Sequence, residues 1–313
     1  MMVNKEKNFI SAVVYVHNAQ NRIEEFLQAV LMTLENNFEH SEIICVNDDS
    51  TDQSAEVIKR VSKQAATASV TILNMSYFHG LETAMNAGMD LTIGDFVLEF
   101  DATILDFEPK EIMTVYRHSL KGYDIVSAAP AGKQRLSSRV FYGIFNHFAH
   151  FPYKMTTERF RILSRRVINR ISSMNKTVPY RKAVYAESGL KVDHLEYMAQ
   201  YGQSKKVDKD EREYRVRLAM DSLILFTEVG YRFSMIMTVL MMVMSVFMTI
   251  YSIVIYSTAH PVEGWTTTIL FLSVAFLGLF GILTIIMKYL QLLVDLVFKR
   301  KHYSFESIEK LTK

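Results

Sequence analysis

The stretch EIICVNDDSTDQSAEVIKR, Glu42–Arg60, decides how this chain folds. It opens with an apolar run of strand length, and a helical pattern begins as soon as that run ends. Three carboxylates, Asp48, Asp49 and Asp52, stand at the junction. In open α/β sheets, ligands bind beyond the carboxyl ends of the strands. The concentration of negative charge at this strand end therefore indicates a binding site.

The segments on both sides repeat the strand-then-helix pattern. Besides Glu42–Asn47, strands are predicted at Phe9–Val16, Val70–Asn74 and Phe96–Phe100. Helices are predicted at 23–37, from Ser50 to about Ala66, and at 80–91. Strands that alternate with helices, and that are apolar on both faces, indicate a mostly parallel sheet covered on both sides. From about Arg135 the pattern turns helical and basic.

Polar residues gather where these strands end. His17 and Asn18 follow the first strand, and Asp101 follows the fourth. No glycine-rich phosphate loop follows the first strand and no Walker-type lysine motif is present, so a dinucleotide fold and a P-loop both fit poorly. Carboxylates accept hydrogen bonds and suit hard cations, but they repel bare phosphate. Such a site binds hydroxyl groups, the N–H groups of a base, or a ligand that arrives with a divalent cation.

Helix capping offers a simpler interpretation of part of this motif. Ser50 could cap the second helix, with Asp52 placed favourably in its first turn. This accounts for two of the polar residues. It does not account for Asp48 and Asp49, which stand side by side.

The overall composition excludes several classes of protein. The 313 residues carry a formal net charge of +2, so the chain lacks the basic footprint of a nucleic-acid-binding protein. The one cysteine, Cys45, lies in an apolar run and is expected to be a reduced thiol in the core. The apolar stretch near the N-terminus continues into a strand pattern, so we expect no signal peptide.

Two apolar segments, Phe233–Tyr256 and Thr266–Met287, contain no charged residue. Each is long enough as a helix to cross a hydrocarbon core of about 30 Å. The turn between them contains no Lys or Arg, whereas basic residues flank the pair, so the positive-inside rule places both ends of this hairpin in the cytoplasm. Spans without internal charge leave a transporter no ion pathway. The methionine-rich first span could pack against another copy of the chain, forming a homo-oligomer, or only against lipid.

This pattern divides the chain into four parts. We expect a cytoplasmic α/β domain at 1–210 and an amphipathic helix lying on the membrane at 211–231. Two transmembrane helices follow within 232–291, and a cytoplasmic tail occupies 292–313. The chain is thus expected to be a multi-pass protein of the bacterial inner membrane.

The motifs together resemble the family 2 glycosyltransferases with a GT-A fold. VNDDSTDQS, Val46–Ser54, is similar to their Asp-Gly-Ser-Thr-Asp signature, and His79–Ala102 follows their order of helix, Gly-Asp and strand before an Asp-x-Asp motif. RLSSRVFYGIFN, Arg135–Asn146, and RFRILSRRVINRI, Arg159–Ile171, look like the C-terminal motifs of the subgroup that uses polyprenyl phosphates. That subgroup includes enzymes like dolichol-phosphate mannose synthase and bactoprenol glucosyltransferase.

The resemblance implies a reaction in which a sugar moves from a nucleotide-sugar, with a UDP-sugar favoured, to a polyprenyl phosphate. By this resemblance, Asn18 and Asp48 contact the base and ribose, and Asp52 organises the loop. Asp101 faces the sugar diphosphate and its divalent cation, Mg²⁺ or Mn²⁺. The implied nucleotide-sugar site comprises Asn18, Asp48, Asp49, Asp52, Asp101 and Thr103. The planar guanidinium groups of Arg135 and Arg161 are expected to meet the acceptor phosphate.

The chain departs from the family pattern at the chemical centre. Thr103 replaces the second acid of the metal motif, and Arg159 stands where the family has an aspartate. One carboxylate and a hydroxyl make a weaker divalent site than two carboxylates. Asp106 or Glu108 could complete the site if the loop bends. The alternative is a catalytically impaired membrane protein that serves as a binding or scaffold subunit.

Overall fold

A computed structural model describes residues 5–132, 136–148, 155–173, 180–199, 216–222 and 305–312, with isolated positions between 233 and 293. The chain divides into two compact units. The first comprises Met1–Asn146, Phe151–Leu218 and Arg300–Lys313, and the second comprises His147–His150 and Ala219–Lys299. The α/β part of the chain, and with it every predicted site residue, belongs to the first unit.

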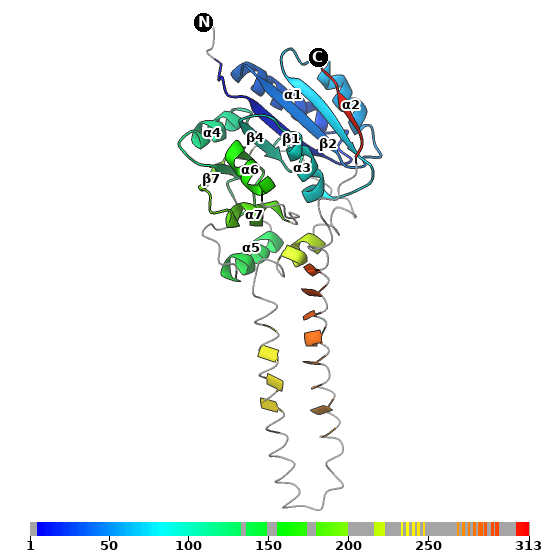
Figure 1. The fold of residues 1–313 in the computed structure, drawn as a ribbon, viewed down its shortest axis with the longest axis vertical. Helices are drawn as coiled ribbons and strands as arrows, with labels where there is room; N and C mark the ends of the chain where they lie inside the picture. Colours follow the sequence, from blue (N-terminus) through cyan, green and yellow to red (C-terminus); the bar gives the residue numbers. More distant parts are fainter. Residues whose placement is uncertain are drawn as a thin grey trace, which may run out of the picture. The chain divides into compact units, whose positions relative to one another are not determined.

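The first unit is built on one eight-stranded sheet with the order β7-β5-β6-β4-β1-β2-β3-β8. Figure 1 labels β1, β2, β4 and β7 of this sheet. Its strands are β1 (Ile10–Val16), β2 (Ser41–Asn47), β3 (Ser69–Met75), β4 (Phe96–Phe100), β5 (Ile125–Pro130), β6 (Phe160–Ser164), β7 (Val192–Tyr197) and β8 (Phe305–Lys310). Neighbours within β4-β1-β2-β3 are parallel, as is the pair β5 and β7. Antiparallel pairs join β6 to β4 and β5, and β8 to β3. The prediction of an α/β fold with parallel central strands is therefore confirmed, within a sheet that is mixed.

Helices cover both faces of this sheet. They are α1 (Ile23–Asn37), α2 (Ser54–Ser62), α3 (Leu81–Asp90), α4 (Lys110–Ser119), α5 (Leu136–Phe148), α6 (Arg165–Ser173) and α7 (Arg181–Glu187). Successive side chains of β1 point to opposite faces of the sheet. Val14 packs in the core beneath α1, α2 and α4, whereas Val13 packs in the core beneath α3 and α6. Cys45 is buried and free, and burial raises the pKa of its thiol to about 12, as expected for a core residue.

The helical prediction beyond Arg135 is wrong in part. Between α5 and α6 the chain forms β6, which enters the sheet beside β4, and after α7 it forms β7. The strand β6 has a buried arginine, Arg161, in the middle of its apolar residues. Arg161 makes this strand hard to predict from the sequence, because an arginine is almost never fully buried unless it is paired.

The last strand, β8, comes from the segment that the sequence indicates only as a tail. It pairs with β3 at the edge of the sheet, and Figure 1 shows it in red beside the label of the C-terminus. The backbone N–H of Val70 donates to the hydroxyl of Thr312 at 2.8 Å, and Leu311 N–H donates to the Val70 carbonyl at 2.8 Å. The end of the chain is thus part of the α/β domain.

Both predicted membrane spans lie mostly outside the described residues. Within the described ranges, no helix combines the length and the apolar character that crossing a bilayer requires. Of the predicted amphipathic helix at 211–231, residues 216–222 are described and are helical.

Candidate active site

The ends of four neighbouring strands form the edge at which the site lies. Because β1 stands between β4 and β2 and all three run parallel, the residues after them share one edge of the sheet. The neighbouring β6 runs antiparallel to β4, so its first residues reach the same edge; Glu99 pairs there with Arg161. Strands lie about 4.8 Å apart. The chain segments that begin at Asp48 and Asp101 are therefore about 10 Å apart, at the two strands that flank β1.

The loops after β1 and β2 are tied to each other by hydrogen bonds. Asn18 N–H donates to the Ser50 hydroxyl at 3.1 Å, and Thr51 N–H donates to the Asn18 side-chain oxygen at 3.0 Å. The Asp52 carboxylate accepts from Gln20 N–H at 2.9 Å and from Ser54 N–H at 3.0 Å. Ser50 thus bonds to the neighbouring loop. The helix α2 begins at Ser54, and its N-cap residue is Gln53, so the simpler interpretation in which Ser50 caps this helix is wrong. These contacts hold the polar loops in one arrangement.

Asp48, the first residue of the loop after β2, is fully buried. Its carboxylate accepts hydrogen bonds from the Tyr15 hydroxyl at 3.0 Å, from His79 N–H at 2.8 Å and from Gly80 N–H at 2.9 Å. Burial raises the pKa of Asp48, and these three donors act in the opposite direction. Gly80, at φ 82°, precedes α3 in a backbone conformation that favours glycine. In this arrangement Asp48 anchors the start of α3 to the end of β2.

Asp49 and Asn18 both have a left-handed backbone, with φ angles of 53° and 45°. The resembling family has a glycine at the position of Asp49, and the backbone gives the reason, because glycine adopts this conformation without strain. Aspartate and asparagine tolerate it better than other side chains do. Asp49 is exposed, so its carboxylate is free to face solvent or a ligand.

Substitutions at Asp49 separate its backbone role from its charge. We expect Asp49→Ala to unfold about 2–4 °C below Asp49→Gly, because a left-handed alanine costs about 1 kcal/mol. Asp49→Asn should retain the thermal stability of the original chain. Thermal unfolding of the purified variants measures both. An alanine variant as stable as the glycine variant would contradict this explanation.

A cluster of buried charges lies at the carboxyl end of β4. This charge cluster consists of Glu82, Glu99, Asp101, Glu158, Arg161, Arg181 and Lys182. Four carboxylates thus face three cations. A buried carboxylate without a partner is strongly disfavoured, so the cations are what permit these acids to stay ionised inside the protein.

Arg161 forms the first bridge of the charge cluster. From β6 its guanidinium reaches Glu99 at 2.8 Å, Asp101 at 2.6 Å and Glu158 at 3.1 Å, and its side chain is only 1% exposed. The resemblance assigns Arg161 to the acceptor phosphate. In this structure its three ion-pair partners are carboxylates, so meeting a phosphate would require it to give up one of them.

Arg181 forms the second bridge, from the start of α7. It contacts Glu82 at 2.9 Å, Glu99 at 2.9 Å and Asp101 at 2.7 Å. The Tyr185 hydroxyl, one turn further along α7, donates to Glu99 at 2.7 Å. Because Glu82 lies in the first turn of α3, Arg181 links that helix to the end of β4.

Asp101 is the more accessible carboxylate at the mouth of the charge cluster, with its side chain 16% exposed. Burial by itself raises the pKa of Asp101, but the guanidinium groups of Arg161 and Arg181 outweigh burial and hold the pKa well below its ordinary value. Asp101 is therefore a fixed anion at neutral pH. One carboxylate oxygen of Asp101 accepts a hydrogen bond from Arg161, and the other accepts one from Arg181.

The remaining candidates near Asp101 are also engaged or buried. Thr103 is 4% exposed. The Arg159 side chain donates from its Nε to both oxygens of Asp106 at 2.9 Å, and the Tyr197 hydroxyl donates to the same carboxylate at 2.9 Å. Glu108 pairs with Lys110. Arg135, the other predicted acceptor contact, lies outside the described residues.

These contacts do not fit a resident divalent cation. Both oxygens of Asp101 are bound by arginines, and Asp106 is neutralised by Arg159, so neither presents a free carboxylate. Within the described ranges no group of three or more His, Cys, Asp or Glu residues is arranged to hold a metal. A cation at Asp101 or Asp106 would have to compete with the guanidinium groups that bind these carboxylates.

Part of this charge cluster has a signal in the sequence. Glu99 interrupts the apolar strand FVLEF, and a carboxylate in such a strand requires a buried partner. That partner, Arg181, follows a segment without clear periodicity and could not be assigned from the sequence.

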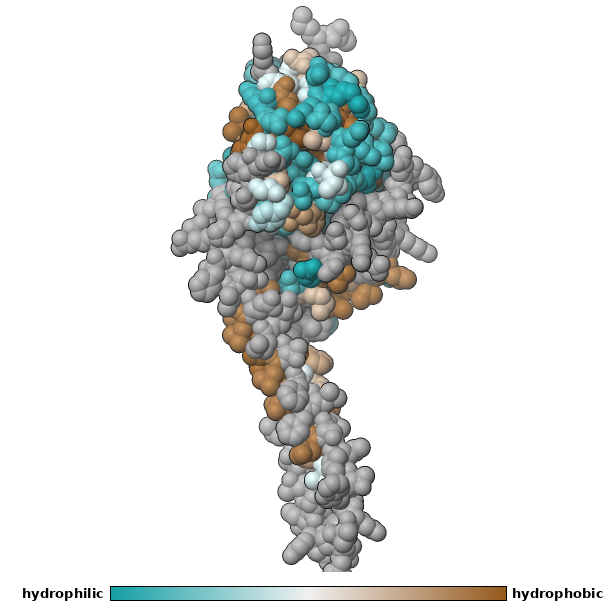
Figure 2. Space-filling view, turned by 90° about the vertical axis from the view of Figure 1, so that its right-hand side faces the viewer, coloured by the Kyte–Doolittle hydropathy of each residue, from teal (hydrophilic) through white to brown (hydrophobic). Residues whose placement is uncertain are grey.

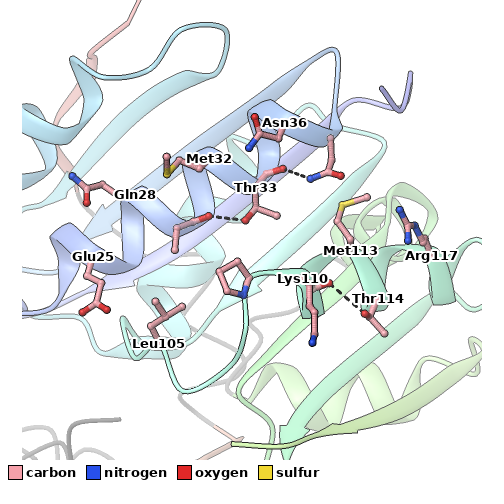
Figure 3. Close-up of a pocket in the computed structure, with 13 residues that line it drawn as sticks. Glu25, Gln28, Met32, Thr33, Asn36, Leu105, Lys110, Met113, Thr114 and Arg117 are labelled. Atoms are coloured by element: carbon pink, nitrogen blue, oxygen red, sulfur yellow. Dashed lines mark hydrogen bonds between the residues drawn. The ribbon is translucent and has the colours of Figure 1, made fainter. Parts of the chain in front are cut away.

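A separate groove of about 770 Å³ lies between α1 and α4 (Figure 3). Met32 and Thr33 line it from α1, and Met113 and Arg117 line it from α4. It contains no member of the charge cluster and no residue of the loops after β1 and β2. The strand-end site is therefore distinct from it.

Comparisons with known proteins agree with the motifs. A sequence model of the family described as Glycosyl transferase family 2 matches residues 11–174. An uncharacterized glycosyltransferase of Synechocystis is 27% identical over 186 residues, which are 58% of this chain and 58% of that protein. An undecaprenyl-phosphate 4-deoxy-4-formamido-L-arabinose transferase of Edwardsiella ictaluri is 30% identical over 146 residues, or 45% of this chain and 44% of that protein. These matches thus span about half of the length of each relative.

The fold is also similar to that of a solved glycosyltransferase structure. The crystal structure of glucosyl-3-phosphoglycerate synthase from Mycobacterium tuberculosis, in complex with Mn²⁺, UDP and glucosyl-3-phosphoglycerate, aligns with a TM-score of 0.52 at 14% identity. The alignment covers 71% of this chain and 81% of that one. At this identity the likeness supports a shared GT-A-like fold.

Proposed function

This chain belongs to glycosyl transferase family 2, and we propose that it transfers a sugar from a nucleotide-sugar to a polyprenyl phosphate at the cytoplasmic face of a membrane. A UDP-sugar is the first candidate for the donor. The observation that carries the proposal is that the loop starting at Asp48 and the acid Asp101 lie at the same edge of the sheet. Both are also tied to the beginning of α3, Asp48 through Gly80 and Asp101 through Arg181 and Glu82.

The loops after β1 and β2 suit the nucleoside part of a donor. Asp49 offers an exposed carboxylate, which accepts hydrogen bonds from ribose hydroxyls and base N–H groups. The oxygens of Asn18 and Asp52 already bind loop N–H groups and offer their remaining lone pairs. The hydrogen bonds between the two loops fix these groups before a ligand arrives. Such preorganisation lowers the entropy cost of binding.

Two observations support a membrane-bound acceptor. Relatives such as the Edwardsiella protein are named for transfer to undecaprenyl phosphate. In addition, α5 exposes Leu136, Val140 and Ile144, which recur at helical spacing on one side and are 79%, 59% and 38% exposed. An exposed apolar stripe of this kind favours contact with a lipid surface.

The second unit supports the predicted transmembrane hairpin. Apolar side chains lie on its surface, brown in Figure 2. Among the described residues of the first predicted span, the following are about half exposed or more: Phe233, Ile236, Leu240, Val243 and Phe247. The chain leaves the first unit at Leu218 and returns to it at Arg300. If the segment between them crosses a bilayer, it must cross an even number of times, since both of its ends attach to one domain. Two spans, with both termini cytoplasmic, satisfy this condition.

The mechanism we propose assigns binding and charge placement to the described residues. The loops after β1 and β2 hold the nucleotide, and the charge cluster presents Asp101 to the hydroxyl groups of the sugar, because a carboxylate accepts hydrogen bonds from hydroxyls and repels a diphosphate that carries no cation. A phosphate monoester is already an anionic nucleophile near neutral pH, so its in-line attack on the anomeric carbon needs little proton abstraction. The new carbon–oxygen bond forms as the bond from the anomeric carbon to the nucleoside diphosphate breaks, and the nucleoside diphosphate leaves. Orientation of the two substrates then provides most of the acceleration. No step is assigned to a metal, because the arrangement of Asp101 does not fit one. The divalent cation stays a prediction that the assay tests.

The test is transfer by the purified full chain. Radiolabelled UDP-sugars and GDP-sugars are mixed with undecaprenyl phosphate in detergent, with Mg²⁺, with Mn²⁺ or with a chelator. We expect one donor to yield a labelled lipid product. A folded chain that binds no donor in any of these conditions would overturn the proposal and favour the scaffold alternative. Equal rates with and without the chelator would overturn the predicted metal requirement alone.

A further inference from the structure

We propose that β8, the strand formed by the end of the chain, positions the donor loop, and that Ser307 is the residue through which it acts. This inference rests on the proposed function, since it concerns the nucleotide part of the same site. It assigns a role to a segment more than two hundred residues away in the sequence from the loop after β2.

Two hydrogen bonds in series connect β8 to that loop. The side-chain amide of Asn74 donates to the Ser307 hydroxyl at 2.9 Å, and the amide of Asn47 donates to the Asn74 side-chain oxygen at 2.9 Å. Asn47 is the last residue of β2, directly before Asp48. The relay therefore crosses three strands and ends at Asn47, the residue directly before the first carboxylate of the candidate site.

Asn47 is the residue through which this relay reaches the binding site. Asn47 is 8% exposed, and its side-chain oxygen finds no hydrogen-bond partner among the residues that the structure describes. A buried acceptor without a donor is costly, so an N–H or O–H group from a bound molecule or a water is expected there. Asn74 holds the other end of the same amide group. The relay thus places an acceptor at the end of β2 where the donor loop begins.

The pairing of β8 with β3 places Ser307 beside Asn74, near the carboxyl end of β3. Ser307 stands opposite Asn74 in the antiparallel pairing, and the register shifts between Asn74 and Met75. Such irregularities re-aim side chains next to binding sites. An ion pair between Glu309 of β8 and Lys59 at 3.1 Å joins the strand to α2 and does not belong to the relay.

Three variants of the full chain test the proposal. Ser307→Ala breaks the relay, Ser307→Thr keeps a hydroxyl, and Glu309→Gln weakens the docking of β8 without touching the relay. We expect Ser307→Ala to raise the Kd for UDP or GDP, whichever binds, and the KM for the sugar donor about threefold to tenfold, the usual effect of one hydrogen bond. The KM for undecaprenyl phosphate should stay unchanged. Ser307→Thr should restore donor binding, and Glu309→Gln should behave like the original chain.

Calorimetric titration with UDP and GDP, thermal unfolding and donor kinetics supply the measurements. Unchanged nucleotide binding in Ser307→Ala would overturn the inference and leave the proposed function intact. An equal loss in Ser307→Ala and Glu309→Gln would also overturn it, because strand docking alone would then be the cause. An original chain that binds neither nucleotide would overturn the proposed function and this inference with it.

Discussion

Asp101→Asn is expected to lower the rate of sugar transfer by about 10²–10³-fold, the usual loss when a preorganised electrostatic group is removed from an active site. The reason lies in the position of Asp101. It is the partly exposed acid at the mouth of the charge cluster, and two arginines keep it ionised. Asparagine has nearly the same shape but removes the negative charge. The measurement is kcat with a saturating donor and undecaprenyl phosphate.

The fold should survive this substitution, which makes the result interpretable. Four carboxylates and three cations form the charge cluster, so the loss of one negative charge leaves three of each sign. We therefore expect thermal unfolding close to that of the original chain. As a matched control, Asp95→Asn alters an acid that directly precedes β4, at the opposite end of the strand from Asp101. Asp95 accepts a hydrogen bond from the backbone N–H of Phe9 and lies outside the cluster. Undiminished turnover in Asp101→Asn would remove Asp101 from the site.

The central strands were predictable because their residues obey simple local rules. The runs that form β1, β2 and β4 are apolar on both faces and end in polar residues, as buried parallel strands do. The boundaries of α1 match the helical spacing of its apolar residues, and β4 was predicted residue for residue. The order of these strands then brings the carboxylates after β2 and β4 to one edge, which is the part of the candidate site that the sequence could predict.

The rest of the site depends on contacts between distant segments. Arg181 and Glu82 are 99 positions apart, and no local pattern reports that they touch. The same holds for Arg159 and Asp106, where an arginine at the family's aspartate position is neutralised by an acid from another loop. For β8 the signal was also missing, because an edge strand beyond two apolar segments looks like a tail until its partner is known. The positions of these buried arginines are explained only by the acids that they contact in the folded chain.

Arg181→Met is expected to destabilise the α/β domain by about 3–5 kcal/mol, the usual cost of leaving a buried charge without its partner. Arg181 is 1% exposed and contacts three carboxylates, of which Glu82 and Glu99 are themselves buried. Methionine fills much of the same volume, so the loss is mainly one of charge compensation. We expect the temperature of unfolding to fall by about 10 °C, measured on the full chain in detergent.

Arg60→Met is the matched control for this prediction. Arg60 contacts Glu24 at 2.6 Å, but both side chains are about half exposed, and exposed pairs contribute about 0–1 kcal/mol. A change of no more than about 2 °C is therefore expected there. The double variant Arg181→Met/Glu82→Gln should recover part of the lost stability, because it removes one of the acids that Arg181 leaves unpaired. An Arg181→Met protein that unfolds at the same temperature as Arg60→Met would show that burial of the charge cluster does not depend on its arginines.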